Sequence, residues 1–372
     1  MRIASIHLPS FSLQAAIAGA PDRAALATRP VAVVDAASPV VTGCSRAAWA
    51  RGVRPGMVAV VARHHAEDLV TLVRDPAGEV ELLRSLADEL LALAPVVDLG
   101  GEPRGQHQAM FVEVPSGKRG AAFGARLVEL FRERGLHVRV GIADDRFTAA
   151  VAAASGDGDG AVTCVPRGGS AAFLAPQPLG LLALPAEVQH MLECLGVKTL
   201  GAFAALPPPS VARSWDADLQ ALARGDSGAR LRPYQPEPRW HERVHVDGQL
   251  DRAVETLAAR VAARLSSRGA GTSQLTMNLG TAAPVALEVD GAMSTEDLGD
   301  ALTRAIGAAS PAVLEASLEA PAAATPTVPA VPPLVLTAVP SILGDRPEHR
   351  RTRRGKQRPR IAPGQARLFS GD

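Results

Sequence analysis

The residues best placed for chemistry at the start of the chain lie where its first predicted strand ends. Ile3 and Ile6 begin a short extended segment, and Pro9 ends it because proline has no amide hydrogen to give to a sheet. A strand that ends in a tight turn is a good place for catalytic carboxylates. Here the turn carries His7 and Pro9, and the nearest downstream carboxylate is Asp22. The first strand therefore offers no acid for metal-assisted chemistry.

Other side chains that often bind metals are poorly spaced for that purpose. His64 and His65 would point to opposite sides of an extended chain, and His241 and His245 would lie about 13 Å apart along a strand. The cysteines lie far apart without a CxxC pair, at Cys44, Cys164 and Cys194. That pattern is typical of a reduced cytoplasmic protein without zinc or disulfides. We therefore expect no metal site.

The composition is that of a globular chain with little overall charge. The 372 residues are 47% hydrophobic and 21% charged, enough for several domains with ample cores. The formal net charge is +1, so any contact with nucleic acid must come from local basic patches. No apolar run approaches the length of about 18 residues that indicates a membrane-spanning helix. We expect a soluble, cytoplasmic protein with no membrane partner.

Strands and helices alternate through residues 1–170, which predicts an α/β domain. Beyond the opening segment, the expected strands are 30–35, 40–43, 58–62, 110–114 and 138–143. The expected helices are 13–20, 45–51, 79–93, 119–134 and 146–154. The helix at 79–93 has apolar residues spaced along one face, as a helix packed on a core requires.

The pattern changes after residue 170. Residues 171–232 predict short helices, and residues 233–344 predict a small α+β unit in the order β-α-β-β-α-β. Its expected elements are 244–246, 251–268, 273–279, 285–289, 295–306 and 334–338. An Ala/Pro-rich loop at 320–333 is expected before the last strand. The arginine-rich tail, 345–372, is expected to be disordered when free.

Residues 192–201 resemble the turn of a helix-hairpin-helix unit. In such a unit, a glycine-containing turn exposes backbone amides to a DNA phosphate. The residues that would make this contact are Gly196, Lys198, Thr199 and Gly201. The alternative is an ordinary helix connection in which glycine caps the first helix. The turn alone favours neither interpretation.

Three motifs in order make the chain resemble a Y-family (translesion) DNA polymerase over nearly its whole length. The family's fingers motif S-Y-x-A-R-x-x-G-V-x-x-G-M is matched at Ser45, Ala48, Gly52, Val53, Gly56 and Met57. Its palm motif G-I-A-x-N-K-x-x-A aligns with residues 141–149, and its thumb motif L-G-V-x-T-L-G with residues 195–201. The resemblance implies a palm and fingers (1–170), a helix-hairpin-helix thumb (171–232), a little finger (233–344) and a basic tail (345–372).

The departures from the family pattern fall on its metal ligands. The resemblance places the acids of the first strand at His7 and Pro9. It places those of the second metal motif at Gln108 and Ala109, and only the final, structural acid is kept, as Glu113. Two-metal phosphoryl transfer needs clustered carboxylates to hold two Mg²⁺ ions. We therefore expect these positions to be degenerate, with no catalytic residue and no cofactor.

The nucleotide-binding positions also differ. The tyrosine and arginine that would hold an incoming triphosphate fall on Arg46 and Trp49, and the palm lysine falls on Arg146. An inactive member with this H-L-P start is similar to the ImuB-type accessory proteins of bacterial mutagenesis. That similarity implies a scaffold for damage-induced, error-prone synthesis. Its expected partners are DNA, the sliding clamp, an error-prone C-family polymerase and a RecA-like accessory protein.

The tail contains two features that fit such a scaffold. Gln365, Leu368 and Phe369 fit the bacterial clamp-binding form Q-x-x-L-F, in which two apolar side chains enter a pocket and the amide makes hydrogen bonds. Residues 346–360 hold eight basic residues against one acid. These are expected to neutralise DNA phosphates, or else to form a solvated linker. The residues assigned to DNA are Arg350, Arg351, Arg353, Arg354, Lys356, Arg358 and Arg360.

Two other functions stay open at this point. An active translesion polymerase could use atypical Mg²⁺ ligands, with Asp98 and Glu102 as the nearby acids. A simpler DNA-binding repair factor would use only its thumb and little finger, and would not bind the clamp.

Overall fold

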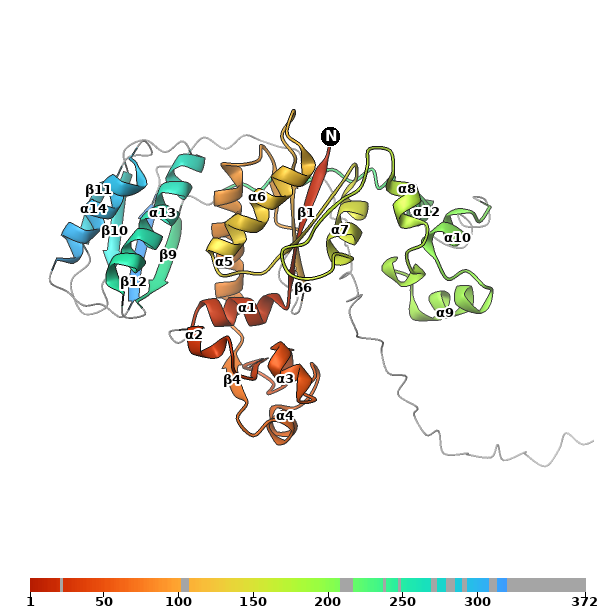
Figure 1. Cartoon of the computed structure of the whole chain (residues 1–372), viewed down its shortest axis with the longest axis horizontal. Helices are drawn as coiled ribbons and strands as arrows, with labels where there is room; N and C mark the ends of the chain where they lie inside the picture. The colour runs from red at the N-terminus through yellow and green to blue at the C-terminus, as the bar shows by residue number, and fades with distance from the viewer. Residues whose placement is uncertain are drawn as a thin grey trace, which may run out of the picture. The chain divides into compact units, whose positions relative to one another are not determined.

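The structure is a computed structural model that describes ten segments of the chain (Figure 1). These are residues 1–20, 23–101, 107–207, 217–236, 239–246, 249–268, 273–278, 285–289, 293–307 and 313–319. The chain forms two units, Met1–Pro340 and Ser341–Asp372, and the second lies outside the described residues. No helix among the described segments is both long and apolar enough to cross a bilayer.

The palm is a five-stranded sheet in the order β5-β6-β1-β7-β8. Its strands are β1 (Ile3–Pro9), β5 (Val97–Asp98), β6 (His107–Glu113), β7 (Arg139–Ala143) and β8 (Val162–Cys164). The first strand is central and runs antiparallel to both β6 and β7. Its helices are α5 (Pro76–Leu91), α6 (Gly120–Glu133) and α7 (Arg146–Ala154), so the predicted α/β alternation is confirmed.

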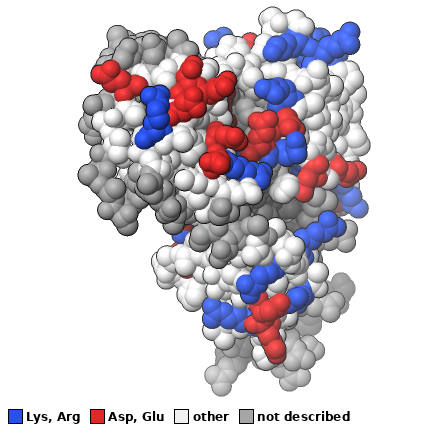
Figure 2. Space-filling model, turned by 60° about the vertical axis from the view of Figure 1, so that its left-hand side comes forward, with Lys and Arg blue, Asp and Glu red and all other residues white. Residues whose placement is uncertain are grey.

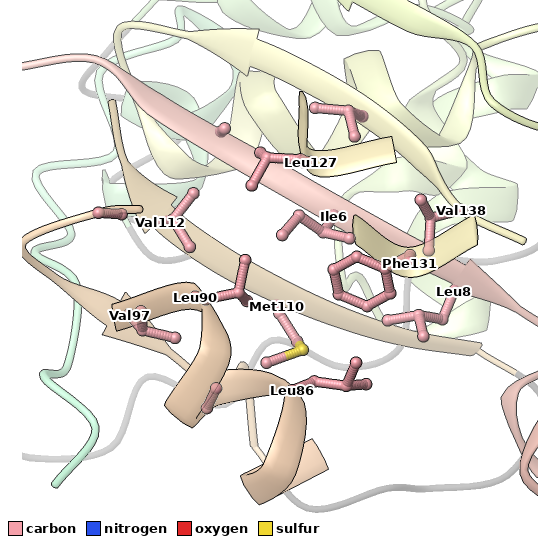
Figure 3. Packing of buried hydrophobic residues seen from close by; sticks show 14 of the residues in the cluster. Ile6, Leu8, Leu86, Leu90, Val97, Met110, Val112, Leu127, Phe131 and Val138 are labelled. Carbon is pink, nitrogen blue, oxygen red and sulfur yellow. The ribbon is translucent and has the colours of Figure 1, made fainter. Parts of the chain in front are cut away.

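Side chains alternate between the two faces of this sheet, and each face packs against different helices. Ile6, Leu8 and Met110 face α5 and α6, where they pack in one cluster with Leu86 and Phe131 (Figure 3). Because side chains of a strand alternate, the intervening residues point to the other face. There Ile3, Phe111, Ala109 and Ala143 pack with Ala149, Ala150 and Ala152 of α7. The opening strand is thus buried on both faces.

The fingers are built on a small sheet in the order β3-β2-β4. It comprises β2 (Val31–Val34), β3 (Val41–Cys44) and β4 (Val70–Val73), with helices α1 (Phe11–Ala18), α2 (Arg23–Leu26), α3 (Arg46–Ala50) and α4 (Ala59–His65). The strand expected at 58–62 is wrong, because most of this segment is the start of α4. Ala59 and Ala62 are buried at helical spacing while Val60 and Val61 are exposed. The β-branched valines predicted a strand, but the buried alanines are spaced as on one face of a helix.

The thumb is a compact group of short helices. These are α8 (Ser170–Leu174), a 3₁₀ turn at Leu179–Leu181, α9 (Ala186–Cys194), α10 (Leu200–Ala204) and α12 (Ala217–Ala223). Leu174, Leu192, Leu200 and Phe203 are buried together between them. The helical region expected between the palm and the little finger is therefore present.

The little finger has the predicted β-α-β-β-α-β order. It comprises β9 (Arg239–His245), α13 (Leu250–Arg268), β10 (Ser273–Asn278), β11 (Val285–Val289), α14 (Thr295–Ile306) and β12 (Val313–Glu319), with sheet order β11-β10-β12-β9. The expected position of the last strand is wrong, because β12 directly follows α14 and pairs with both β9 and β10. Leu314 and Ala316 of β12 are buried against the helices. Residues 320–338, which include the loop and strand expected there, lie outside the described residues.

Candidate functional site

The register of the palm sheet brings together the four positions where an active polymerase would carry acids. His7 lies opposite Ala109, Leu8 opposite Gln108, and Pro9 opposite His107. The end of β1 and the start of β6 thus meet as the resemblance requires. No carboxylate occupies any of the four positions.

The Gln108 side chain links the start of β6 to the turn that follows β5 by hydrogen bonds. Its side-chain amide donates to the carbonyl oxygens of Leu99, at 2.8 Å, and Gly101, at 3.1 Å. Between them, Gly100 has a φ of +76°, and a Cβ there would lie 1.9 Å from the Ala109 carbonyl oxygen. The turn therefore packs directly on the strand. In this position the Gln108 amide acts as a structural hydrogen-bond donor.

Asp98 lies in β5, the strand that pairs with β6, and its oxygens are already engaged. It is 3% exposed. One oxygen accepts from the Gly100 amide at 2.8 Å, and the other accepts from the Arg232 amide at 2.9 Å. The second oxygen also lies 3.3 Å from an Arg146 guanidinium nitrogen. This carboxylate is bound by protein donors on both sides. The alternative ligand Glu102 lies outside the described residues.

Arg146 fills the space beside Asp98 with a positive charge. It is the first residue of α7, at the position of the family's palm lysine, and it is buried. Its guanidinium carbon lies 4.2 Å from the centre of the Phe111 ring, a cation–π contact. Burial lowers the pKa of Arg146, and the charge of Asp98 opposes that effect. The side chain is thus turned into the palm rather than toward solvent.

The two acids that precede Arg146 also have structural roles. Asp145 caps α7 by accepting from the Thr148 amide at 2.9 Å, and it accepts from the Ser170 hydroxyl at 2.9 Å. Asp144 accepts from the Gly168 amide at 2.7 Å. These bonds join the palm to the first turn of the thumb.

The donor set of this site does not fit a pair of magnesium ions. It consists of an imidazole, an amide and one carboxylate that already binds a guanidinium and two backbone amides. Mg²⁺ needs several free oxygen ligands in near-octahedral geometry. Across the described segments, no three histidine, cysteine, aspartate or glutamate side chains gather where they could hold a metal ion.

In the fingers, the positions expected to bind a triphosphate hold Arg46 and Trp49 in place of a tyrosine and an arginine. Ser45 caps α3 by accepting from the Ala48 amide. The guanidinium of Arg54 lies 4.0 Å from the centre of the Trp49 ring and donates to the Trp49 carbonyl oxygen at 2.6 Å. Arg46 is exposed on the same helix. Trp49 is therefore held by a neighbouring arginine within the fingers.

The thumb turn uses most of its backbone amides inside the protein. Gly196 donates to the Glu193 carbonyl oxygen at 3.1 Å, and Gly201 donates to that of Ala175 at 3.0 Å. Thr199 caps α10 through its hydroxyl. Lys198 is exposed on the turn. The DNA contact assigned to these residues stays a prediction, and Lys198 is the member of the group best placed to make it.

The residues assigned to the tail lie outside the described residues. They comprise the clamp motif and the basic run: Arg350, Arg351, Arg353, Arg354, Lys356, Arg358, Arg360, Gln365, Leu368 and Phe369. Their binding roles therefore stay predictions. The face of the molecule in Figure 2 carries acidic and basic side chains intermixed, which agrees with the small net charge.

Sequence reasoning missed the pairing of Asp98 with Arg146 and a set of buried charges between the palm and the little finger. Arg264, for example, is 0% exposed. It follows the buried Val261 by three residues and Leu257 by seven, so its spacing placed it on the apolar face of α13. A charged residue on an apolar helix face was the available signal.

Comparisons with known proteins relate the sequence to DNA polymerases and to ImuB. The impB/mucB/samB family matches residues 6–154. ImuB of Caulobacter vibrioides is 26% identical over 238 residues, which cover 60% of this chain and 50% of that protein. DNA polymerase IV of Dehalococcoides mccartyi is 26% identical over 174 residues, which cover 45% of this chain and 43% of that protein. The chain thus spans about half the length of these curated relatives.

Solved structures show the same fold over a greater length. A crystal structure of DinB from Sulfolobus solfataricus superposes with a TM-score of 0.50 at 12% identity, covering 86% of this chain and 99% of that one. An insertion ternary complex of Dbh DNA polymerase superposes with a TM-score of 0.51 at 13% identity, and it covers the same shares of the two chains. The chain therefore has the fold of Y-family DNA polymerases, and its residues 6–154 match the impB/mucB/samB family. ImuB-type proteins are among its relatives.

Proposed function

We propose that this chain is a non-catalytic, polymerase-like adaptor that binds damaged primer-template DNA and the sliding clamp to support error-prone translesion synthesis. The observation that carries the proposal is the state of the palm site. Its four ligand positions hold no acid, and Asp98 is bound to Arg146 and to two backbone amides. A site of this kind has no free carboxylates with which to bind two Mg²⁺ ions.

DNA binding is supported by the fold and by two basic features. Lys198 is exposed on the thumb turn, and the run at 346–360 holds eight basic residues. Because this contact would be to phosphates, affinity should fall steeply with salt and show little sequence preference. A direct check is the binding of a labelled primer-template at several salt concentrations. Binding that does not weaken as salt rises would contradict the phosphate-based account.

Clamp binding is supported by the motif at Gln365, Leu368 and Phe369. The two apolar side chains would enter a pocket and supply most of the affinity. A pull-down with a bacterial clamp should retain the native chain and lose Phe369→Ala. Ala366→Ser, at a variable position of the same motif, should bind as the native chain does. Equal retention of both variants would remove the clamp from the proposal.

The further partners are an error-prone C-family polymerase and a RecA-like protein. They follow from the similarity to ImuB-type proteins, of which this chain spans about half the length. In this account the protein brings those partners to the clamp and leaves synthesis to the polymerase. Co-purification of each partner with the full chain, with and without the clamp, tests the assignment.

Two alternative functions make different predictions. An active translesion polymerase with atypical Mg²⁺ ligands must bind a nucleoside triphosphate, which the positions of Arg46 and Trp49 disfavour. Titration of a fluorescent nucleotide with Mg²⁺ separates that function from the proposed one. A simple DNA-binding repair factor predicts DNA binding without clamp binding. The clamp pull-down distinguishes this case.

A further inference from the structure

A set of charged and polar side chains, most of them buried, lies where the little finger meets the palm. Helix α13 packs along α5, and side chains from both domains meet between and beside these helices. We call this set the interdomain ion cluster. Its palm members are Glu81, Ser85, Asp88, Glu89 and Arg134, and its little-finger members are Glu242, Arg260 and Arg264.

The pair at the centre of the cluster is Asp88 with Arg264. Both side chains are 0% exposed, and Arg264 Nε lies 2.9 Å from Asp88 Oδ2. The other Asp88 oxygen accepts from the Tyr234 hydroxyl at 3.1 Å. One palm carboxylate therefore holds both the little-finger helix and the segment that leads into the little finger.

Glu242 of β9 connects the remaining members. It is 4% exposed and lies 3.5 Å from Arg134 of the palm. It also lies 3.5 Å from Arg264 and 3.7 Å from Arg260, and it accepts from the Ser85 hydroxyl. Burial would raise the pKa of Glu242, but the three arginines and the Ser85 hydrogen bond outweigh it, so the pKa is lowered.

The segment before the little finger is fastened to the edge of the palm sheet. Strand β5 is an edge strand, and its Val97 carbonyl oxygen accepts from the Tyr234 amide at 2.6 Å. Asp98 accepts from the Arg232 amide at 2.9 Å. The connection thus bonds to the palm through Arg232 and Tyr234.

The contact between α13 and α5 lies on one side of the palm sheet. Helix α5 covers the sheet face that carries Ile6 and Met110, whereas His7 and Ala109 alternate onto the other face. The little finger therefore docks against the helical layer behind His7 and Ala109.

We propose that the interdomain ion cluster fixes the little finger in one orientation on the palm, so that the two domains bind a ligand as a single preset unit. Burying charge is costly unless every partner is present, so such pairs contribute more to orientation than to net stability. A rotated contact would bury Arg264 or Glu242 without its partners. In this structure, both Arg264 and Glu242 have their partners.

Hydrogen exchange of the unaltered full chain is the first test. The amides of α5 and α13 should exchange as slowly as the palm core, because the facing surfaces stay together. Small-angle X-ray scattering should fit one orientation of the little finger, with and without primer-template DNA. Fast exchange along the α13 face, or scattering that requires several orientations, would overturn the proposal.

A matched pair of variants is the second test. Glu242→Gln leaves three arginines short of a partner, and we expect exchange of the facing helices to quicken by roughly a hundredfold or more. Glu129→Gln removes a similar partner from Arg132, but on the exposed surface of α6, and should leave exchange unchanged. Equal rates of hydrogen exchange in the two variants would refute the proposal that the interdomain ion cluster fixes the little finger. If Glu242→Gln does not fold, Arg260→Met should show a smaller change in the same direction, because it removes the 3.7 Å contact with Glu242 and a hydrogen bond to the Arg243 carbonyl oxygen but leaves Arg134 and Arg264 in place.

Discussion

Arg146 Nη1 lies 3.3 Å from Asp98 Oδ2, and both side chains are buried in the palm. This ion pair stands beside the strands where a Y-family polymerase would bind metal and nucleotide. It joins the first turn of α7 to the edge strand β5. An internal cation thus satisfies the carboxylate that could otherwise have served as a ligand.

Removing the charge of Asp98 should destabilise the palm strongly. Asp98→Asn leaves the buried Arg146 guanidinium without its ion-pair partner, and the expected loss in the free energy of unfolding is about 3–5 kcal/mol. Urea unfolding followed by circular dichroism measures it. Asp68→Asn is the control, because its partner Arg51 is exposed and such pairs contribute about 0–1 kcal/mol. Similar losses in the two variants would show that the Asp98 pair has no special role.

The turn after β5 should tolerate only glycine at its centre. Gly100→Ala would place a Cβ 1.9 Å from the Ala109 carbonyl oxygen at a φ of +76°. The turn would have to move away from β6, and Gln108 would lose its hydrogen bonds to that turn. We expect a loss of several kcal/mol, on the order of 2–4, measured by chemical denaturation.

The matched glycine is Gly299 in α14, where a Cβ would lie 3.9 Å from the Ala258 Cβ. Gly299→Ala should be neutral or stabilising by about 0.5–1 kcal/mol because alanine is the better helix former. A larger loss at Gly299 than at Gly100 would contradict the close packing described for the β5 turn.

The contact between the domains should weaken in acid. Because the pKa of Glu242 is lowered from its ordinary value of 4.5, its contribution is fully present above about that pH and is lost as pH falls through the lower folded value. The groups facing it are Ser85 and three arginines, with Asp88, Glu89 and Glu81 nearby in the same cluster. After correction for intrinsic rates, the rate of amide hydrogen exchange in α13 should therefore stay constant from pH 7 to about 5. It should increase as the pH falls below about 4.

Glu242→Gln separates this effect from the other carboxylates. The variant should lack the part of the acid transition that Glu242 causes, since glutamine does not titrate. An identical pH profile in the variant and the native chain would assign the transition to Asp88, Glu89 or Glu81 instead.

Lys198 should contribute to DNA affinity as a phosphate contact. Lys198→Ala is expected to weaken primer-template binding several-fold at all sequences and to reduce the slope of log affinity against log salt by about one. Lys118→Ala, in an exposed palm turn, is the control and should change neither quantity. Loss of affinity in both variants to the same degree would point to a general charge effect.

Much of the fold was predictable because its local patterns agree with its packing. The apolar spacing of 79–93 and 119–134 predicted α5 and α6, and both helices pack that face on the palm sheet. The motifs aligned His7 and Ala109 with metal-ligand positions, and the structure pairs these two residues across β1 and β6.

The misplaced elements have local causes. Val60 and Val61 favoured a strand, yet only the alanines of α4 face the core. The last little-finger strand was placed at 334–338 because its apolar run is stronger than that of β12. In β12, Leu314 and Ala316 alternate with acids and small residues, so only pairing with β9 and β10 identifies it. The buried charges of α5 and α13 could not be paired from sequence, because their partners lie in another domain.

The proposed function requires that the palm does not catalyse DNA synthesis. Primer extension with the full chain, all four deoxynucleoside triphosphates and either Mg²⁺ or Mn²⁺ tests it most directly, beside an active Y-family polymerase on the same template. We predict no template-dependent incorporation at any enzyme concentration that still binds the primer-template. Incorporation that follows the template and disappears in a folded Asp98→Asn variant would contradict the account.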